Sequence, residues 1–357
     1  MLEKNVVLTG KTVLVTGCAG FIGSNLVKEL LGRFSPVNIV GIDSVNDYYD
    51  VSLKEFRLRG LDAAAALHPE SSWTFVRGNI ADKACIDKLF AETHPSVVVN
   101  LAAQAGVRYS IDHPDAYIES NLIGFYNILE ACRHNPVEHL VYASSSSVYG
   151  GNTKVPFSTD DKTDSPVSLY AATKKSNELL AHAYSKLYSI PSTGLRFFTV
   201  YGPAGRPDMA YFGFTEKLRR GEKIKIFNYG NCKRDFTFVD DIVEGITRVM
   251  TSAPELKNGA DGLPVPPFRV YNIGNSSPEN LLDFVSILEE ELVRAGVLPA
   301  DYDFDAHREL VPMQPGDVPV TYADTSALER DFDFRPSTSL RTGLRAFAEW
   351  YRSFYIG

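Results

Sequence analysis

A short apolar run near the N-terminus leads directly into a glycine-rich turn, and this stretch limits the possible folds more than any other. Thr12–Thr16 is rich in β-branched residues and predicts a buried parallel strand. Gly17, Gly20 and Gly23 follow the strand, and a helical pattern begins at about Ser24. The first glycine permits a tight turn, the second lets backbone approach a pyrophosphate, and the third lets the helix pack closely on the strand. Because the N–H groups of a helix N-terminus bind phosphates, the stretch predicts a dinucleotide site.

The second predicted strand, Asn38–Ile42, ends at an acidic residue. Asp43 lies 20 residues after Gly23, where a carboxylate can hold the hydroxyl pair of a cofactor ribose. The same charge would repel the 2′-phosphate of NADP, so this position favours NAD. The alternative interpretation is that Asp43 is an ordinary turn residue.

Strand and helix patterns alternate regularly up to about residue 200. Further strands are predicted at Trp73–Arg77, Val97–Leu101, Leu140–Ala143 and Ser192–Phe198, and helices at about residues 83–92, 117–133 and 168–188. This alternation predicts an α/β fold with a doubly wound parallel Rossmann sheet. The pattern beyond Gly202 is mixed and predicts a smaller mixed α/β C-terminal lobe for the substrate. We therefore predict an NAD-binding domain over residues 1–200 and a lobe over 201–357, with segments at about 236–275 returning to the first domain.

Small or polar residues follow the third and fourth predicted strands. Ligands of open α/β sheets bind at this edge. Asn79 and Ile80 follow the third strand and can approach an adenine. Leu101, Ala102 and Ala103 end the fourth strand and leave room for a flat ring or a ribose.

Tyr170 and Lys174 are four residues apart in a predicted helix, so the two side chains share one helix face. A free tyrosine, with a pKa near ~10, is a poor base at neutral pH, but a nearby cation favours its phenolate form. The pair is a candidate general base, although an ordinary amphipathic helix gives the same spacing. The serines at 144–147 end the fifth strand. They are either a polar strand exit or hydroxyl groups that can shuttle a proton to Tyr170.

The composition argues against several kinds of partner. The 357-residue chain has a formal net charge of −8, which makes nucleic acid and anionic membranes poor candidates. The four cysteines are scattered, so a disulfide framework and structural zinc are not expected, and no metal site is predicted. No apolar run reaches the ~18 residues of a membrane span and no signal peptide is recognised, so a cytoplasmic location is predicted.

Longer strings in the chain resemble a known family. The glycine turn, the serines after the fifth strand and the Tyr170–Lys174 pair resemble the extended short-chain dehydrogenase/reductases over essentially the whole chain. Within that superfamily the strings at residues 41–50, 105–110, 196–210 and 313–318 are similar to the NAD-dependent nucleotide-sugar epimerases. They are most similar to the UDP-glucuronate 4-epimerases.

The resemblance implies a reaction and a set of site residues. The reaction would be the reversible C4 epimerisation of UDP-glucuronate to UDP-galacturonate, through a 4-keto intermediate and with tightly bound NAD. Tyr170 would be the base, Lys174 would bind the nicotinamide ribose and tune Tyr170, and Ser145 would assist at the sugar hydroxyl. The residues implied to bind NAD are Gly17, Gly20, Phe21, Ile22, Gly23, Asp43, Ser44, Asn46, Asn79, Ile80, Leu101, Ala102, Ala103, Asn121, Tyr170, Lys174 and Phe197. Those implied to contact the UDP-sugar are Arg108, Ser145, Ser146, Ser147, Thr199, Arg206, Phe227, Arg234 and Asp317.

The resemblance also implies a homodimer built on the helices at 117–133 and 168–188. The chain departs from the family pattern at Asn79, Asn100 and Ala204, where relatives often have Asp, His and Trp, and Ala204 bears on substrate fit or a subunit contact. Three alternatives stay open: a 4-epimerase for UDP-glucose or UDP-N-acetylglucosamine, a UDP-glucuronate decarboxylase, and a non-catalytic NAD-sensing scaffold protein. The presence of both Tyr170 and Lys174 argues against the scaffold.

Overall fold

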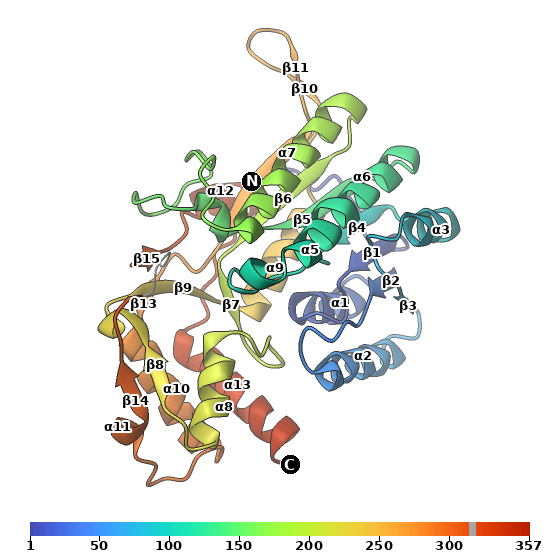
Figure 1. The fold of residues 1–357 in the computed structure, drawn as a ribbon. Coiled ribbons are helices and arrows are strands. Elements are labelled where there is room, and N and C mark those ends of the chain that lie inside the picture. Colours follow the sequence, from blue (N-terminus) through green and yellow to red (C-terminus); the bar gives the residue numbers. More distant parts are fainter. Residues whose placement is uncertain (314–318) are drawn as a thin grey trace.

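Seven parallel strands form the central sheet of the computed structural model, which describes residues 1–313 and 319–357 (Figure 1). The strand order is β12-β6-β5-β4-β1-β2-β3. The strands are β1 Thr12–Thr16, β2 Asn38–Asp43, β3 Ser72–Arg77, β4 Val97–Asn100, β5 His139–Ser145, β6 Ser192–Phe197 and β12 Phe268–Ile273. The order reverses between β1 and β4, so a crevice for a ligand opens at their carboxyl ends. The predicted doubly wound parallel sheet is confirmed.

Helices cover both faces of this sheet. The first face is covered by α1 Phe21–Arg33, α2 Val51–Ala66 and α9 Val239–Met250, and the second by α3 Lys83–Thr93, α6 Gly124–His134 and α7 Leu169–Tyr188. Because side chains alternate along a strand, Val13 and Val15 of β1 pack with the first set and Leu14 packs with the second. Both faces are apolar, as the β-branched strand sequences predict.

The predicted helix over residues 117–133 is confirmed, but it contains a π-helical turn. After the short helix α4 Tyr109–Asp112, α5 Pro114–Tyr117, the π-helical turn Ile118–Ile123 and α6 follow one another without a break. The π-helical turn has a tertiary cause. The buried Asn121 side chain accepts a hydrogen bond from the Gln104 N–H at 2.8 Å and donates to the hydroxyl of Thr173 at 3.0 Å. These bonds across three elements favour a widened turn, which is common at functional sites.

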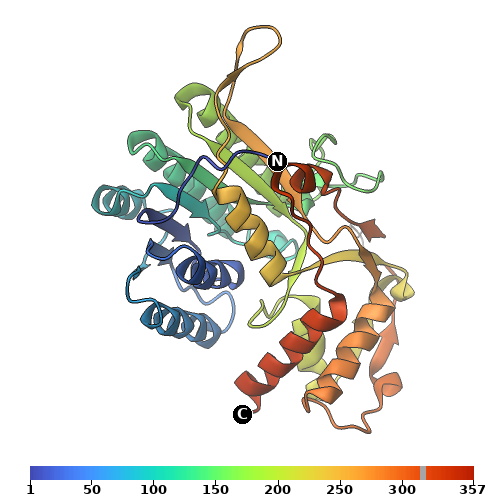
Figure 2. The same ribbon diagram turned by 180° about the vertical axis from the view of Figure 1, so that it is seen from behind.

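The C-terminal lobe is smaller and mixed. It contains a four-stranded sheet in which β9 pairs with β7, β13 and β15, a two-stranded sheet of β8 and β14, and the packed helices α10 and α13. The bounds are β7 Thr199–Tyr201, α8 Ala210–Arg219, β8 Ile224–Ile226, β9 Lys233–Phe238, β13 Pro278–Asn280, α10 Leu281–Arg294, α11 Phe304–His307, β14 Arg308–Leu310, β15 Val320–Thr321, α12 Ser326–Phe332 and α13 Leu340–Tyr355. Two short 3-10 helices span Ser146–Tyr149 and Phe227–Gly230. A hairpin of β10 Lys257–Asn258 and β11 Pro264–Val265 extends away from the body (Figure 2).

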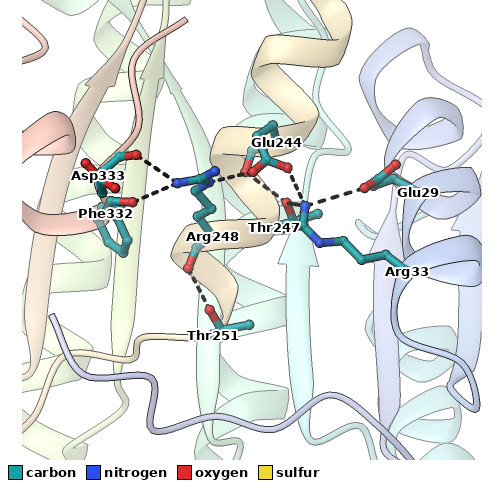
Figure 3. Close-up of polar contacts among 8 residues, drawn as sticks. All are labelled: Glu29, Arg33, Glu244, Thr247, Arg248, Thr251, Phe332 and Asp333. Atoms are coloured by element: carbon teal, nitrogen blue, oxygen red, sulfur yellow. Dashed lines mark hydrogen bonds and ion pairs between the residues drawn. The ribbon is translucent and has the colours of Figure 1, made fainter. Parts of the chain in front are cut away.

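The chain returns from the lobe to the central sheet. After β9, α9 packs beside α1 and β12 pairs in parallel with β6. Polar contacts fasten α9 on both sides (Figure 3). Arg33 of α1 contacts Glu244, and Arg248 donates to the carbonyl oxygens of Phe332 at 3.1 Å and Asp333 at 2.8 Å. The apolar core is therefore continuous between the first face of the sheet and the lobe. Among the described residues, no helix is long and apolar enough to cross a membrane.

Candidate active site

The turn after β1 is a cradle of backbone. Gly17 has a φ of +71°, which favours glycine, and a Cβ atom on Gly17 would lie 2.8 Å from the Ala102 nitrogen. A Cβ on Gly23 would lie 2.2 Å from the Gly17 carbonyl oxygen, so no side chain fits there. The N-cap residue of α1, Gly20, makes no side-chain hydrogen bond to the first turn. The exposed N–H groups of this turn suit a diphosphate.

Asp43 lies at the end of β2, beside this turn. One carboxylate oxygen accepts a bond from the Ala19 N–H at 3.1 Å and the other from the Val45 N–H at 2.8 Å. Each oxygen keeps further acceptor capacity for a ribose hydroxyl. The ammonium of Lys54 donates to the backbone oxygen of Asn46 at 2.6 Å, and this bond holds the loop that follows Asp43. The structure therefore fits an NAD ribose at this position.

A cavity runs from the glycine turn to Tyr170 and is lined by most of the residues implied to bind the cofactor. The lining includes Gly17, Gly20, Phe21, Ile22, Gly23, Asp43, Ser44, Asn46, Asn79, Ile80, Leu101, Ala102, Ala103, Tyr170, Lys174 and Phe197. Asn79 is committed to local bonds, because its amide donates to Glu119 at 2.9 Å and accepts from the Ala81 N–H at 2.9 Å. Asn121 lies behind the lining, where it holds Gln104, which does line the cavity.

Tyr170, Lys174 and Ser145 meet at one end of the cavity. Ser168 caps α7 by accepting a bond from the Ala171 N–H at 3.1 Å, so Tyr170 lies in the first turn. Tyr170 and Ser145 both line this part of the cavity, and Ser145 acts to lower the pKa of the Tyr170 phenol. The Lys174 ammonium is buried and donates to the carbonyl oxygen of Ala143 at 2.9 Å.

Burial sets the ionisation of this group. Burial raises the pKa of the Tyr170 phenol, and the Ser145 hydroxyl and the positive charge of Arg206 oppose that rise. Burial, and then the charge of Arg206, lowers the pKa of Lys174 to about 8. The structure thus adds Arg206, which lines the cavity, as a cation that acts on Tyr170. The arrangement can accept a proton from an alcohol through Tyr170 once its phenolate is stabilised.

The residues implied to contact the substrate are more dispersed. Ser145 and Arg206 line the cavity, whereas Arg108, Ser146, Ser147, Thr199, Phe227 and Arg234 lie outside its lining. The guanidinium of Arg108 lies 5.6 Å from the centre of the Phe227 ring, so two predicted contacts meet across the cleft between sheet and lobe. Arg234 donates to the carbonyl oxygen of Pro319 at 3.1 Å. Asp317 lies outside the described residues.

Two of the serines at the end of β5 are hydrogen-bonded to each other. Ser145 accepts a bond from the Ser147 N–H at 3.1 Å and donates to the Ser147 hydroxyl at 3.1 Å. Ser146 and Ser147 are half-buried, and so is Thr199 on β7. Three residues with hydroxyl groups are thus partly exposed near the end of β5 and on β7.

A buried polar network supports α7 from behind. The Arg196 guanidinium donates to both carboxylate oxygens of Glu178 at 2.8 Å, and Ser144 donates to the same carboxylate at 2.7 Å. Arg196 also donates to the Tyr149 hydroxyl at 3.0 Å, which in turn donates to Asn272 of β12 at 2.6 Å. Glu178 lies one helical turn beyond Lys174, so the network joins the helix of the candidate base to β5, β6 and β12.

Sequence reasoning missed several residues of the site. Tyr48, Lys54 and Gln104 line the cavity, and Arg57 is buried beside it. Arg57 left a signal in the sequence. It lies between Leu53 and Leu61 at intervals of four residues, so the buried stripe of α2 contains a charged residue. An arginine on an apolar stripe must find acceptors inside the protein.

The fold and the site define a dinucleotide-binding α/β protein of the Rossmann type. A model of the NAD dependent epimerase/dehydratase family matches residues 13–274. Protein CapI from Staphylococcus aureus is 50% identical over 351 residues, covering 96% of this chain and 99% of that protein. UDP-glucuronate 4-epimerase 4 from Arabidopsis thaliana is 47% identical over 355 residues, covering 98% of this chain and 77% of that protein. The chain belongs to the NAD-dependent epimerase/dehydratase family.

A solved structure has the same fold. UDP-glucuronic acid 4-epimerase from Bacillus cereus, in complex with UDP-glucuronic acid and NAD, matches with a TM-score of 0.80 at 31% identity. The match covers 96% of this chain and 100% of that one. The cavity of this chain therefore occurs on the fold of an enzyme solved with both a nucleotide sugar and NAD.

Proposed function

We propose that the protein is an NAD-dependent UDP-glucuronate 4-epimerase, which interconverts UDP-glucuronate and UDP-galacturonate. The observation that carries the proposal is the half-buried Tyr170, which lines one cavity together with Ser145, Lys174 and the glycine cradle. Relatives named UDP-glucuronate 4-epimerase that cover nearly the whole chain support the substrate. The cradle and Asp43 fit the diphosphate and a ribose of NAD.

The chemistry divides between the cofactor and the chain. Bound NAD supplies a hydride acceptor that becomes a hydride donor within the same cycle. Tyr170 as phenolate accepts the proton of the sugar 4-hydroxyl and later returns it to the 4-oxygen of the product, while Ser145 donates to the same oxygen. Lys174 holds the nicotinamide ribose, and the charge of Arg206 favours the phenolate. Because water is largely excluded from the buried site, these charges act strongly on one another.

The substrate side must hold a uronate without losing carbon dioxide, because the 4-ketone is β to the carboxylate. We assign the hydroxyl groups of Thr199, Ser146 and Ser147 to hold this carboxylate away from the cleavage orientation. Phe227 and Arg234 are assigned to the UDP part, Arg234 through charge-assisted bonds to the diphosphate. Arg108, Arg206 and Asp317 complete the proposed set. The UDP part tethers the 4-keto sugar while it turns over, so much of the binding energy belongs to the nucleotide.

The proposed function assigns a role to each part of the chain. We propose that residues 1–200 form the NAD-binding domain and residues 201–357 mainly the UDP-sugar lobe, with a return over about 236–275. The pairing of β12 with β6 supports that return.

A reducing, cytoplasmic location is also proposed. All four cysteines are free thiols, which supports it.

A homodimer is also proposed. An apolar groove on the second face of the sheet is lined by Leu122, Ile123, Tyr126, Ser176, Leu179 and Leu180. Leu179 is 60% exposed and Ile123 47% exposed, which is costly for a monomer. Pairing this face with that of a second copy would bury both grooves. Leu179→Asp should convert the dimer to a monomer in sedimentation experiments, and an unchanged sedimentation coefficient would exclude this interface.

The reaction is tested directly. Purified protein is incubated with UDP-glucuronate, without added NAD, and the products are followed by proton NMR. The expected product is UDP-galacturonate, with no release of carbon dioxide. Release of carbon dioxide would identify a decarboxylase, and turnover of UDP-glucose but not of the uronate would exclude the proposed substrate.

The base assignment has its own test. Tyr170→Phe removes the proton acceptor but keeps the ring, so turnover should be lost while NAD stays bound. A Tyr170→Phe enzyme that retained a near-normal rate would show that another group is the base.

A further inference from the structure

The segment between β7 and α8, residues 202–209, forms part of the cavity wall, and we call it the strap. Arg206 and Met209 of the strap line the cavity. Its other members include Ala204, which has a φ of +51°, an unusual conformation for a residue with a side chain. Such a conformation persists only where surrounding contacts hold it.

The inner end of the strap is held by Arg57 of α2. This side chain is 1% exposed. Its guanidinium donates to the carbonyl oxygen of Ala204 at 2.7 Å and to that of Gly205 at 3.1 Å. The same group donates to the carbonyl oxygen of Ala19, in the glycine turn, at 3.0 Å and to the Tyr49 hydroxyl at 2.6 Å. One buried cation thus binds the strap, the phosphate cradle and the loop after Asp43.

The outer end of the strap is held by Tyr48 and Asp208. The Tyr48 hydroxyl donates to Asp208 at 3.3 Å, and the Arg206 guanidinium donates to the same carboxylate at 2.9 Å. Burial, followed by the charge of Asp208, raises the pKa of Tyr48 to about 12, so its hydroxyl stays a donor at neutral pH. Tyr48 belongs to the loop after Asp43, on the cofactor side, and Asp208 belongs to the strap.

A third segment, the loop after β4, packs closely against the contact between Tyr48 and Asp208. Gly106, in the loop after β4, has a φ of +104°. A Cβ atom there would lie 3.0 Å from the Tyr48 hydroxyl and 3.6 Å from the Asp208 carboxylate. The contact between Tyr48 and Asp208 is therefore closely packed against a third loop.

We propose that the strap, tied down by Arg57 and by the Tyr48–Asp208 contact, retains NAD in the cavity through successive turnovers. Arg57, Tyr48 and Asp208 are positioning residues, because they act through the strap. The inference rests on the proposed function in one respect, that NAD is the ligand of this cavity. A dinucleotide lying between the glycine turn and Tyr170 can leave only when the strap lifts, and lifting it breaks both ties.

The test measures NAD release from the loaded, full-length protein. NAD-loaded protein is mixed with ethanol and an excess of alcohol dehydrogenase, which reduces each released NAD to absorbing NADH. Tyr48→Phe, which loses one polar contact to a charged group, should release NAD about five- to tenfold faster than wild type. Asp208→Asn also weakens the ion pair with Arg206, so it should release NAD at least as fast as Tyr48→Phe. Arg57→Lys, which cannot reach all its acceptors, should release it faster still.

The matched control is Tyr271→Phe, which removes a tyrosine–aspartate hydrogen bond of 2.7 Å, to Asp331, away from the cavity lining. This variant should release NAD at the wild-type rate. Thermal unfolding of each variant, measured without NAD, separates a local effect from lost folding, and Tyr48→Phe is expected to unfold within a few degrees of the wild type.

Release rates of Tyr48→Phe and Asp208→Asn equal to that of Tyr271→Phe would overturn the inference while leaving the proposed function intact. A wild-type protein that binds no NAD would overturn both. Faster release with unchanged unfolding temperature supports the strap, because a merely structural role would alter stability without altering the rate of NAD loss.

Discussion

The two walls of the cavity are built by different means. The cofactor wall is made of backbone: the turn at Gly17, the close approach of Gly23 and the uncapped start of α1. The substrate wall is made of side chains that depend on one another, such as Arg206 with Asp208. A backbone wall binds a diphosphate through main-chain N–H groups. It therefore requires that no side chain block the approach of the ligand to the backbone.

The difference determines where each wall is vulnerable. The cofactor wall should fail at the addition of a single methyl group, whereas the substrate wall should change its affinity and pH dependence gradually. The distinction is between backbone geometry on one wall and side-chain charge on the other. The following variants test it, from the largest expected effect to the smallest.

Gly23→Ala should abolish NAD binding and turnover. The added Cβ would lie 2.2 Å from the Gly17 carbonyl oxygen, so either the turn or α1 must move. NAD content after gel filtration and the NMR assay measure the effect. Gly213→Ala is the matched control, because no atom lies within 4 Å of its added Cβ in α8. It should retain activity and gain up to about 1 kcal/mol of stability. A Gly23→Ala protein that still binds NAD would refute the backbone wall.

Glu178→Gln tests the buried support that both walls share. The substitution leaves the Arg196 charge buried and uncompensated, so the free energy of unfolding should fall by about 3–5 kcal/mol. Urea unfolding measures this fall. Glu290→Gln is the control, since its ion pair with Arg341 at 2.7 Å joins side chains that are 60% and 45% exposed. That pair should contribute less than about 1 kcal/mol. If the free energy of unfolding fell equally in the two variants, the buried network would contribute no more to stability than an exposed ion pair.

Lys174→Met tests a buried cation that lines the cavity beside Tyr170. Turnover should be lost, but the NAD-free variant should be more stable than NAD-free wild type at pH 7, by about 1–3 kcal/mol. The sign follows from the pKa of Lys174, which burial lowers to about 8 from an ordinary 10.5. The cost of burying the ammonium is complete below pH 8 and disappears as the pH rises toward 10.5. The stability gap, measured by calorimetry, should therefore shrink between these pH values, and a gap that widened would contradict the assignment.

Arg206→Gln tests the substrate wall and should have the mildest effect. The charge of Arg206 opposes the rise in the pKa of Tyr170. Its removal should raise that pKa further, so the acidic limb of the kcat/KM profile should move to higher pH. Values of kcat/KM measured at pH values well above the acidic limb should change least. An unshifted limb, together with a higher KM, would assign Arg206 to substrate binding alone.

The sequence was informative where the structure depends on local rules. Strand periodicity and glycine spacing predicted β1 to β6 and the cradle, because these features need only short-range patterns. The helix over 117–133 was predicted but its π-helical turn was not, since the bonds of Asn121 to Gln104 and Thr173 join separate elements. The ties of the strap were missed for the same reason, as Arg57 and Ala204 are 147 positions apart. No local pattern encodes a partner at that distance.

The return of the chain to the main sheet limits how family members can be recombined. β12 pairs with β6 along its whole length, from Phe268 opposite Ser192 to Ile273 opposite Phe197. A chimaera with one crossover near residue 200 would place an edge strand from one parent against β6 of the other. Exchange of substrate specificity by grafting the lobe should therefore use several junctions and leave α9 and β12 with the parent that supplies β6.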